Sequence, residues 1–133
     1  MRTFQLEGFA YGLAAVALLA ACAPASAEGD ATKGKAAFAK CAICHNFETN
    51  GVGPELKSIV GRKAASVADY TYSPGMKKLG DEGFTWTEEH LDKWIADPKA
   101  MIPDSPMSLA FPGIPDAGER ADIIAYLKTE TGQ

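Results

Sequence analysis

The pentapeptide Cys41-Ala42-Ile43-Cys44-His45 carries the residue types in this sequence that are best suited to chemistry. Two thiols three positions apart can reach the two vinyl groups of one porphyrin and form thioether bonds with them. The histidine that follows is then held beneath the iron as an axial ligand. Cys-x-x-Cys-His is the signature of covalent haem attachment. The motif therefore predicts one haem c, bound through Cys41 and Cys44, with its iron ligated by His45.

Two other kinds of site use the same residue types. A zinc site would need a fourth ligand, and His90, the second histidine of the sequence, lies in the polar part of a predicted helix. A redox-active cysteine pair usually accompanies a βαβ pattern, which this sequence lacks. We favour the haem interpretation over both alternatives.

A haem iron also has a sixth position, and Met107 is the candidate for it. Met107 lies between serines and prolines in a segment that is rigid enough to hold a thioether against the open face of the ring. Thioether sulfur stabilises ferrous iron and raises the reduction potential. Met76 and Met101 are interpreted as core residues. Ligation by His45 and Met107 leaves no open position for oxygen or peroxide, which favours electron transfer over enzymatic catalysis.

Hydrophobic periodicity predicts four or five helices that position these residues. The first runs from about residue 31 to 40 and ends at Cys41. Ser73 and Pro74 are suited to begin a second helix that reaches about residue 79. A third follows Thr87 and ends before Pro98, and the last spans about residues 116–129.

The connecting segments are long for such a short chain. An irregular loop with one short turn is predicted over residues 46–61, which are rich in glycine. Five prolines between positions 98 and 115 predict a stiff, extended segment without regular structure. No stretch has the alternation of a strand. The sequence thus predicts an all-α domain with loops that wrap around a cofactor.

The first 27 residues are expected to form a signal peptide, and residues 28–133 a single domain. Arg2 precedes an apolar stretch of residues 9–21, which is shorter than the roughly 20 residues that span a bilayer. The pattern Ala25-Ser26-Ala27 suits signal peptidase, whereas Leu19-Ala20-Ala21-Cys22 resembles a lipoprotein signal that would acylate Cys22. We favour removal after Ala27. Either route takes the domain to the periplasm.

The overall charge excludes one class of partner. The chain of 133 residues has a formal net charge of −4 at pH 7. Nucleic acid, which is bound chiefly through basic side chains on phosphates, is therefore not an expected partner. We expect a monomer that meets the membrane only through its partners, or through a lipid on Cys22.

From residue 33 to residue 128 the sequence resembles the class I cytochromes c, the small electron carriers of bacteria and mitochondria. The resemblance rests on an ordered set of motifs: Gly34 and Phe38 in the first helix, Cys41-x-x-Cys44-His45, Gly53-Pro54, Gly61-Arg62, Tyr70-Thr71-Tyr72, Thr85-Trp86, Asp97-Pro98-Lys99, Ile102-Pro103, Met107 and Ala125-Tyr126-Leu127. It implies the cytochrome c fold, four to five helices with long loops around one covalently bound haem.

The resemblance also implies roles for individual residues. The Pro54 carbonyl would accept a hydrogen bond from the His45 ring. Arg62, Tyr72 and Trp86 would surround one buried haem propionate with donors, and Ser105 would take the place of a threonine hydroxyl near the other propionate. Gly34 would let the first helix cross the last one closely near Tyr126, with Phe38 packed beneath.

Two departures from the family pattern change the surroundings of the ligand. The run from Met107 to Gly113 is two residues longer than usual, so either Leu109 or Phe111 could cover the haem on this side. Met76 stands where an asparagine is usual near the buried propionate.

The resemblance further implies a periplasmic carrier of single electrons between respiratory or photosynthetic proteins. Expected partners are a quinol-oxidising complex, a terminal oxidase, a reaction centre or a dehydrogenase. A dedicated relay subunit of a periplasmic dehydrogenase is the alternative. In the family, lysines near the haem edge steer docking, and Lys35, Lys40 and Lys99 match that region, although Asp104 lies in the same loop.

Overall fold

The computed structural model describes residues 28–130. The predicted signal peptide of residues 1–27, with Cys22, lies outside the described residues. Within them the chain forms six α-helices and one 3₁₀ helix: α1 (Ala31–Ala37), η1 (Phe38–Lys40), α2 (Pro74–Asp81), α3 (Glu88–Ala96), α4 (Pro98–Met101), α5 (Pro106–Ala110) and α6 (Ala117–Glu130). The only strand-like pairing in this part of the chain is an isolated bridge between Lys63 and Thr85. The all-α prediction is confirmed.

Local capping explains where the helices begin. The Asp30 carboxylate accepts hydrogen bonds from the backbone N–H groups of the first turn of α1. The Ser73 hydroxyl accepts from the N–H of Met76 at the start of α2, and the Thr87 hydroxyl accepts from the N–H of His90 at the start of α3. Each side chain satisfies a donor that has no partner within its own helix. The four helices predicted from the sequence are thus present, within two residues of their expected ends.

The prediction of an extended segment between the prolines at 98 and 115 is wrong, because two further short helices form there. Pro98 begins α4 and Pro106 begins α5. Proline interrupts a helix from within, but at the first position its missing N–H costs nothing and its fixed φ suits the helix. The Asp97 carboxylate adds a cap by accepting from the N–H of Ala100 at 3.1 Å. The helix count therefore exceeds the four or five expected.

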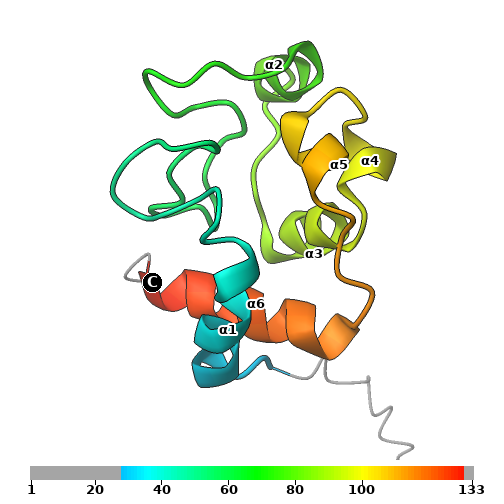
Figure 1. The fold of residues 1–133 in the computed structure, drawn as a ribbon. Coiled ribbons are helices and arrows are strands. Elements are labelled where there is room, and N and C mark those ends of the chain that lie inside the picture. Colours follow the sequence, from blue (N-terminus) through cyan, green and yellow to red (C-terminus); the bar gives the residue numbers. More distant parts are fainter. Residues whose placement is uncertain (1–27, 131–133) are drawn as a thin grey trace, which may run out of the picture.

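The two terminal helices cross closely at the base of the molecule, where α1 lies against α6 (Figure 1). The crossing is made possible by Gly34, since a Cβ atom there would lie only 1.9 Å from the Asp122 carbonyl oxygen. Beside the crossing, Phe38 packs against Phe47 and Tyr126 with ring centroids 5.0 and 5.4 Å apart. The close crossing and the packing of Phe38 expected from the sequence are both confirmed.

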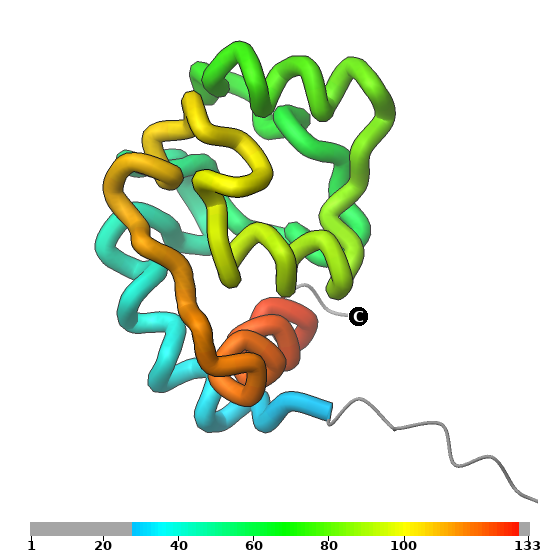
Figure 2. Tube along the Cα trace, turned by 90° about the vertical axis from the view of Figure 1, so that its right-hand side faces the viewer, coloured from blue at the N-terminus to red at the C-terminus, as the bar shows by residue number. Residues whose placement is uncertain are grey.

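The loop of residues 41–73 and the segment with α4 and α5 lie on opposite sides of the molecule in Figure 1, and α3 is seen between them in this view. Figure 2, turned by 90°, shows the segment after α5 running down the molecule to α6. The region predicted as an irregular loop is irregular, with an Ile59 N–H to Leu56 carbonyl bond of 3.1 Å in its short turn. Among the described helices, none is long and apolar enough to cross a membrane.

Candidate cofactor site

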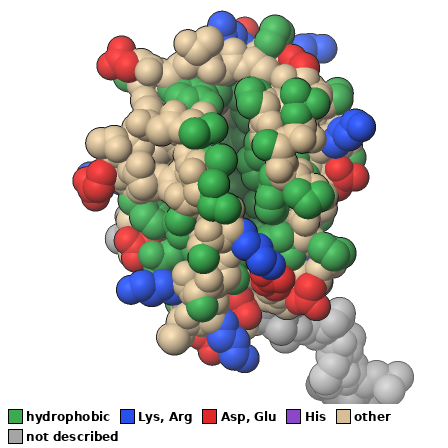
Figure 3. Space-filling view, viewed as in Figure 1, with side chains coloured by type: hydrophobic (Ala, Val, Ile, Leu, Met, Phe, Trp, Pro, Cys, Tyr) green, Lys and Arg blue, Asp and Glu red, His purple; other side chains and the backbone are tan. Residues whose placement is uncertain are grey.

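A cavity of about 730 Å³ lies between these two sides of the molecule. In space-filling view it is a hollow bordered by hydrophobic side chains (Figure 3). Its volume falls in the range of pockets that enclose cofactors and drug-sized ligands. All nine residues predicted for the cofactor line it: Cys41, Cys44, His45, Pro54, Arg62, Tyr72, Trp86, Ser105 and Met107.

The two cysteines are presented by a tight turn that follows η1. The N–H groups of Cys44 and His45 both donate to the Cys41 carbonyl, at 3.0 and 2.9 Å. The Cys44 carbonyl accepts from the N–H of Gly53 at 2.8 Å, which ties the turn to the next loop. Both thiols are half-buried and neither is in a disulfide. The turn therefore directs two thiols and one imidazole towards a single cavity.

Burial raises the pKa of the Cys41 thiol to about 11. A thiolate is what both alternative sites need, either to bind zinc or to act as a redox nucleophile. His90, the remaining histidine, stacks on Phe84 with ring centroids 4.2 Å apart and donates to the Thr85 carbonyl. Within the described residues no group of three or more His, Cys, Asp or Glu side chains could hold a metal ion. The zinc and redox-pair interpretations thus lack support.

The His45 ring is fixed by its neighbours in the loop. Its Nδ1 lies 2.8 Å from the Pro54 carbonyl oxygen. Since a carbonyl can only accept, Nδ1 carries the proton and Nε2 keeps a lone pair. Burial, with a smaller contribution from Arg62, lowers the pKa of His45, which favours the neutral imidazole that a metal requires. Gly53 lies under the ring, where a Cβ atom would be 2.3 Å from Cε1.

Met107 enters the cavity from α5. The turn before it is held by the Ser108 hydroxyl, which donates to the Ile102 carbonyl at 2.6 Å inside the protein. Phe111 is half-buried and lines the cavity, whereas Leu109 is 80% exposed and does not. Leu109 and Phe111 are the two side chains expected to cover the haem on the Met107 side, and the structure therefore favours Phe111.

The other two methionines that were interpreted as core residues both pack against the core. Met76 also lines the cavity, while Met101 does not. Met76 therefore places an apolar side chain at a wall where the family pattern has an amide.

Arg62 and Trp86 are brought together by the backbone. The Trp86 N–H donates to the Arg62 carbonyl at 2.8 Å, next to a bond of 2.7 Å from the Gly61 N–H to the Trp86 carbonyl. The Arg62 guanidinium donates to the Glu55 carboxylate at 3.1 Å and to the carbonyls of Glu55 and Lys57 at 2.8 and 2.7 Å. These bonds use three of its five N–H groups, which leaves donors for an anionic group in the cavity.

Tyr72 completes this wall. Its hydroxyl oxygen accepts from the Val67 N–H at 3.1 Å and keeps its own proton to donate. Burial raises the pKa of Tyr72, although the Val67 bond acts in the opposite direction. The phenol therefore stays protonated and remains a donor at ordinary pH. Ser105 also lines the cavity and is buried.

Several contacts around the cavity were not anticipated from the sequence. Arg120 of α6 donates to the Asp92 carboxylate and to the carbonyls of Ile114 and Pro115, at 2.7, 2.9 and 2.9 Å. Lys40 forms an ion pair with Glu119, and both side chains lie at the cavity wall. Asp92 and Arg120, like Lys40 and Glu119, are far apart in sequence, so no local spacing could have revealed these two pairs.

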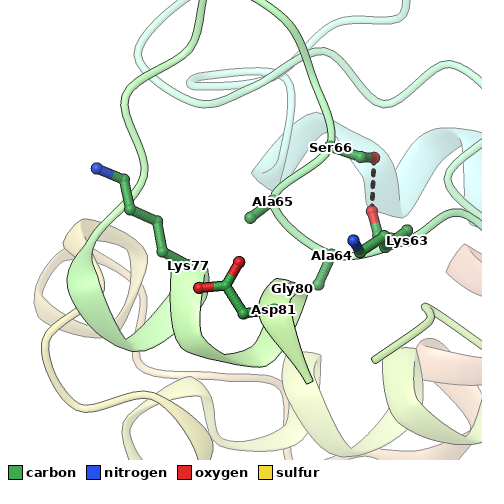
Figure 4. Close-up of a pocket in the computed structure, with 7 residues that line it drawn as sticks. All are labelled: Lys63, Ala64, Ala65, Ser66, Lys77, Gly80 and Asp81. Carbon is green, nitrogen blue, oxygen red and sulfur yellow. Dashed lines mark hydrogen bonds between the residues drawn. The ribbon is translucent and has the colours of Figure 1, made fainter. Parts of the chain in front are cut away.

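A second hollow, of about 180 Å³, lies between α2 and the loop at Ala64. Figure 4 shows the Asp81 carboxylate of α2 pointing towards the loop, where the Ser66 hydroxyl donates to the Lys63 carbonyl, whereas the Lys77 side chain extends away from it. It contains none of the predicted site residues. The larger cavity is therefore the candidate site.

The larger cavity fits a haem in both shape and chemistry. Its wall is mainly apolar, as a porphyrin requires, with two thiols at one wall and spare donors from Arg62 and Tyr72 for carboxylates. The lone pair on His45 Nε2 is of the kind that would bind a haem iron. The donor set and the volume suit this cofactor better than a smaller polar ligand.

Comparison with known proteins agrees with this assignment. The family model described as Cytochrome c matches residues 31–131. A cytochrome c2 of Agrobacterium tumefaciens is 46% identical over 103 residues, covering 75% of this chain and 91% of that protein. A cytochrome c2 of Rhodomicrobium vannielii is 42% identical over 114 residues, covering 84% of this chain and 87% of the relative.

Solved structures agree as well. Cytochrome cH from Methylobacterium extorquens superposes with a TM-score of 0.69 at 53% identity, covering 76% of this chain and 99% of that one. Cytochrome c2 from Rhodospirillum centenum gives a TM-score of 0.71 at 32% identity, covering 77% of this chain and 99% of that one.

The chain belongs to the cytochrome c family and is a class I monohaem cytochrome c. It carries one covalently bound haem c with its iron, and it acts as an electron carrier rather than an enzyme. Its partners are redox proteins. The resemblance inferred from the ordered motifs is confirmed.

Proposed function

We propose that this protein is a periplasmic carrier of single electrons, with haem iron ligated by Nε2 of His45 and the sulfur of Met107. The observation that carries the proposal is the hydrogen bond from His45 Nδ1–H to the Pro54 carbonyl at 2.8 Å. It orients the ring, raises its basicity and leaves Nε2 as the only nitrogen able to bind iron. Met107 reaches the same cavity from the other side of the molecule.

The bound haem supplies a one-electron couple between ferrous and ferric iron. Met107, as a soft thioether, would favour the reduced state of the iron, and together with His45 it would leave no open position for another ligand. The surrounding protein keeps this arrangement rigid: Gly53 packs under the imidazole, and the Ser108 hydroxyl braces the turn that carries Met107. A site that changes little on reduction is suited to rapid electron transfer.

Thioether attachment is proposed through Cys41 and Cys44, which the turn after η1 directs into the cavity. Arg62 and Tyr72 then provide donors for one propionate, beside the buried indole of Trp86. Ser105 is proposed to serve the second propionate. These donors offset the cost of holding a carboxylate in an apolar wall.

The mouth of the cavity is proposed as the docking face for a respiratory or photosynthetic partner. Ile43 and Val52 line the cavity and yet are 80% and 74% exposed, so they lie at its edge. Lys40, one of the lysines expected to steer docking, is paired with Glu119. A partner therefore meets this face mainly through apolar contacts. The affinity of docking should depend less on salt concentration than it would if the cavity mouth were surrounded by lysines without acidic neighbours.

Periplasmic location is supported by the signal pattern of residues 1–27. The proposed processing removes these residues after Ala27, so that the mature chain begins at Glu28. Intact mass of the exported protein distinguishes this start from an acylated Cys22.

The ligand assignment is tested by expressing the haem-loaded protein with the haem maturation system and recording ferric spectra and redox titrations. Wild type should have the weak long-wavelength band of methionine-sulfur ligation. Met107→Ala should lose the band, bind carbon monoxide rapidly when reduced and have a lower potential. Met101→Ala, a core methionine away from the cavity, should keep the band. A Met107→Ala protein with unchanged spectrum and potential would contradict the assignment.

A further inference from the structure

The segment that leads to Met107 is fastened to the start of α2 by one side chain, Asp104. Its carboxylate accepts from the N–H of Gly75 at 2.8 Å and from the Ser73 hydroxyl at 3.3 Å. The Ser73 oxygen in turn accepts from the N–H of Met76. Asp104 thus takes part in the cap of a helix that lies 29 residues earlier in the chain.

The contact is close as well as polar. A Cβ atom on Gly75 would lie 2.3 Å from an Asp104 carboxylate oxygen and 2.9 Å from Cγ2 of Ile102. Only glycine allows the segment to approach α2 to this extent. The helix pairs that pack extensively within the described chain do not include α2. The contact at Asp104 is therefore the main polar link between α2 and the segment before α5.

The charge of Asp104 suits this place. Gly75 is the second residue of α2, and its N–H is among the donors that a helix leaves unpaired at its start. A carboxylate there accepts a charge-assisted hydrogen bond and lies at the positive end of the helix dipole. An uncharged side chain would hold the segment less tightly.

The consequence concerns the ligand. Ser73, which caps α2, and Met76 within α2 line the same cavity as Ser105, Pro106 and Met107 of the fastened segment. We propose that Asp104 is a positioning residue that holds the Met107-bearing segment against α2 and so keeps the methionine sulfur on the iron. This role rests on the ligation proposed above.

The test is competition for the iron in the ferric, haem-loaded protein. Imidazole is added stepwise while the loss of the long-wavelength absorption band is measured, because imidazole binds the iron only when the methionine leaves it. Asp104→Ala is expected to bind imidazole about tenfold more tightly than wild type, which corresponds to about 1.4 kcal/mol. Asp104→Asn keeps one acceptor for the Gly75 N–H and should give a smaller increase, which also provides a measurement if the alanine variant folds poorly.

The matched control is Asp116→Ala. Asp116 is likewise an exposed aspartate that caps a helix, accepting from the N–H of Glu119 at 2.6 Å at the start of α6. It should lower stability without changing imidazole affinity. Equal affinities for Asp104→Ala and wild type, or equal shifts in both alanine variants, overturn the positioning role. A wild type without the band overturns the Met107 assignment, and the role of Asp104 with it.

Discussion

The crossing of α1 and α6 at Gly34 gives a quantitative prediction for the variant Gly34→Ala. The new Cβ would lie 1.9 Å from the Asp122 carbonyl oxygen and 2.9 Å from Cβ of Tyr126. Both obstacles belong to the neighbouring helix rather than to the end of a flexible side chain. To reach ordinary contact with the oxygen, near 3.4 Å, the helices must separate by about 1.5 Å.

The expected loss of stability follows from two opposing effects. Forcing extra atoms into a packed interface costs about 1–3 kcal/mol, and here the upper part of the range applies because a backbone group is in the way. Alanine gains about 1 kcal/mol over glycine through helix propensity. The net decrease in the free energy of unfolding should be about 2 kcal/mol, or roughly 10 °C in Tm for a domain of this size.

Guanidinium unfolding of the haem-loaded protein, followed by circular dichroism, measures this change. Gly118→Ala is the control, since Gly118 lies in the first turn of α6 and a Cβ there would meet only a side-chain atom, the Asp116 carboxylate oxygen at 3.2 Å, which needs to shift by only a few tenths of an ångström. That variant should be as stable as wild type or up to about 1 kcal/mol more stable. If the two alanine variants differ by less than about 0.5 kcal/mol, the close crossing does not require glycine and the reasoning is refuted.

Three further substitutions probe the cavity wall and the contacts beside it. Gly53→Ala should push the His45 ring from its position, because a Cβ would lie 2.3 Å from Cε1, and should shift the Soret band and the potential. Tyr72→Phe removes the acceptor of the Val67 N–H and should cost about 1 kcal/mol in chemical unfolding; an unchanged midpoint would contradict the role of that bond. Arg120→Ala removes one carboxylate and two carbonyl contacts and should cost about 2 kcal/mol, with Arg120→Lys recovering only part of it.

The sequence was informative where the physical cause is local. Ser73 and Thr87 could be recognised as caps because each bonds to an N–H three residues later. The spacing of Cys41 to His45 specified the cofactor without any knowledge of the fold. The proline-rich segment is harder to predict, because a proline can break a helix or begin one, and Pro98 and Pro106 each occupy the first position of a helix.

Contacts between distant parts of the chain could not be predicted. Asp104 bonds to Gly75, and Arg120 bonds to Asp92, at separations of 29 and 28 residues. A single aspartate or arginine in a sequence has no pattern that identifies its partner. The resemblance to a family placed residues near the haem, but it did not indicate that Glu55 and two carbonyls would hold Arg62.

The size of the cavity has a consequence for the life of the protein in the cell. A cavity of about 730 Å³ that holds no haem leaves its mainly apolar wall in contact with water instead of with a porphyrin. Losing that contact lowers the free energy of unfolding, which for most domains is only about 5–15 kcal/mol. A chain that has not received haem is therefore expected to be less stable than the loaded protein and more open to proteases. The amount of this protein should accordingly follow the supply of haem, and turnover should remove whatever remains unloaded.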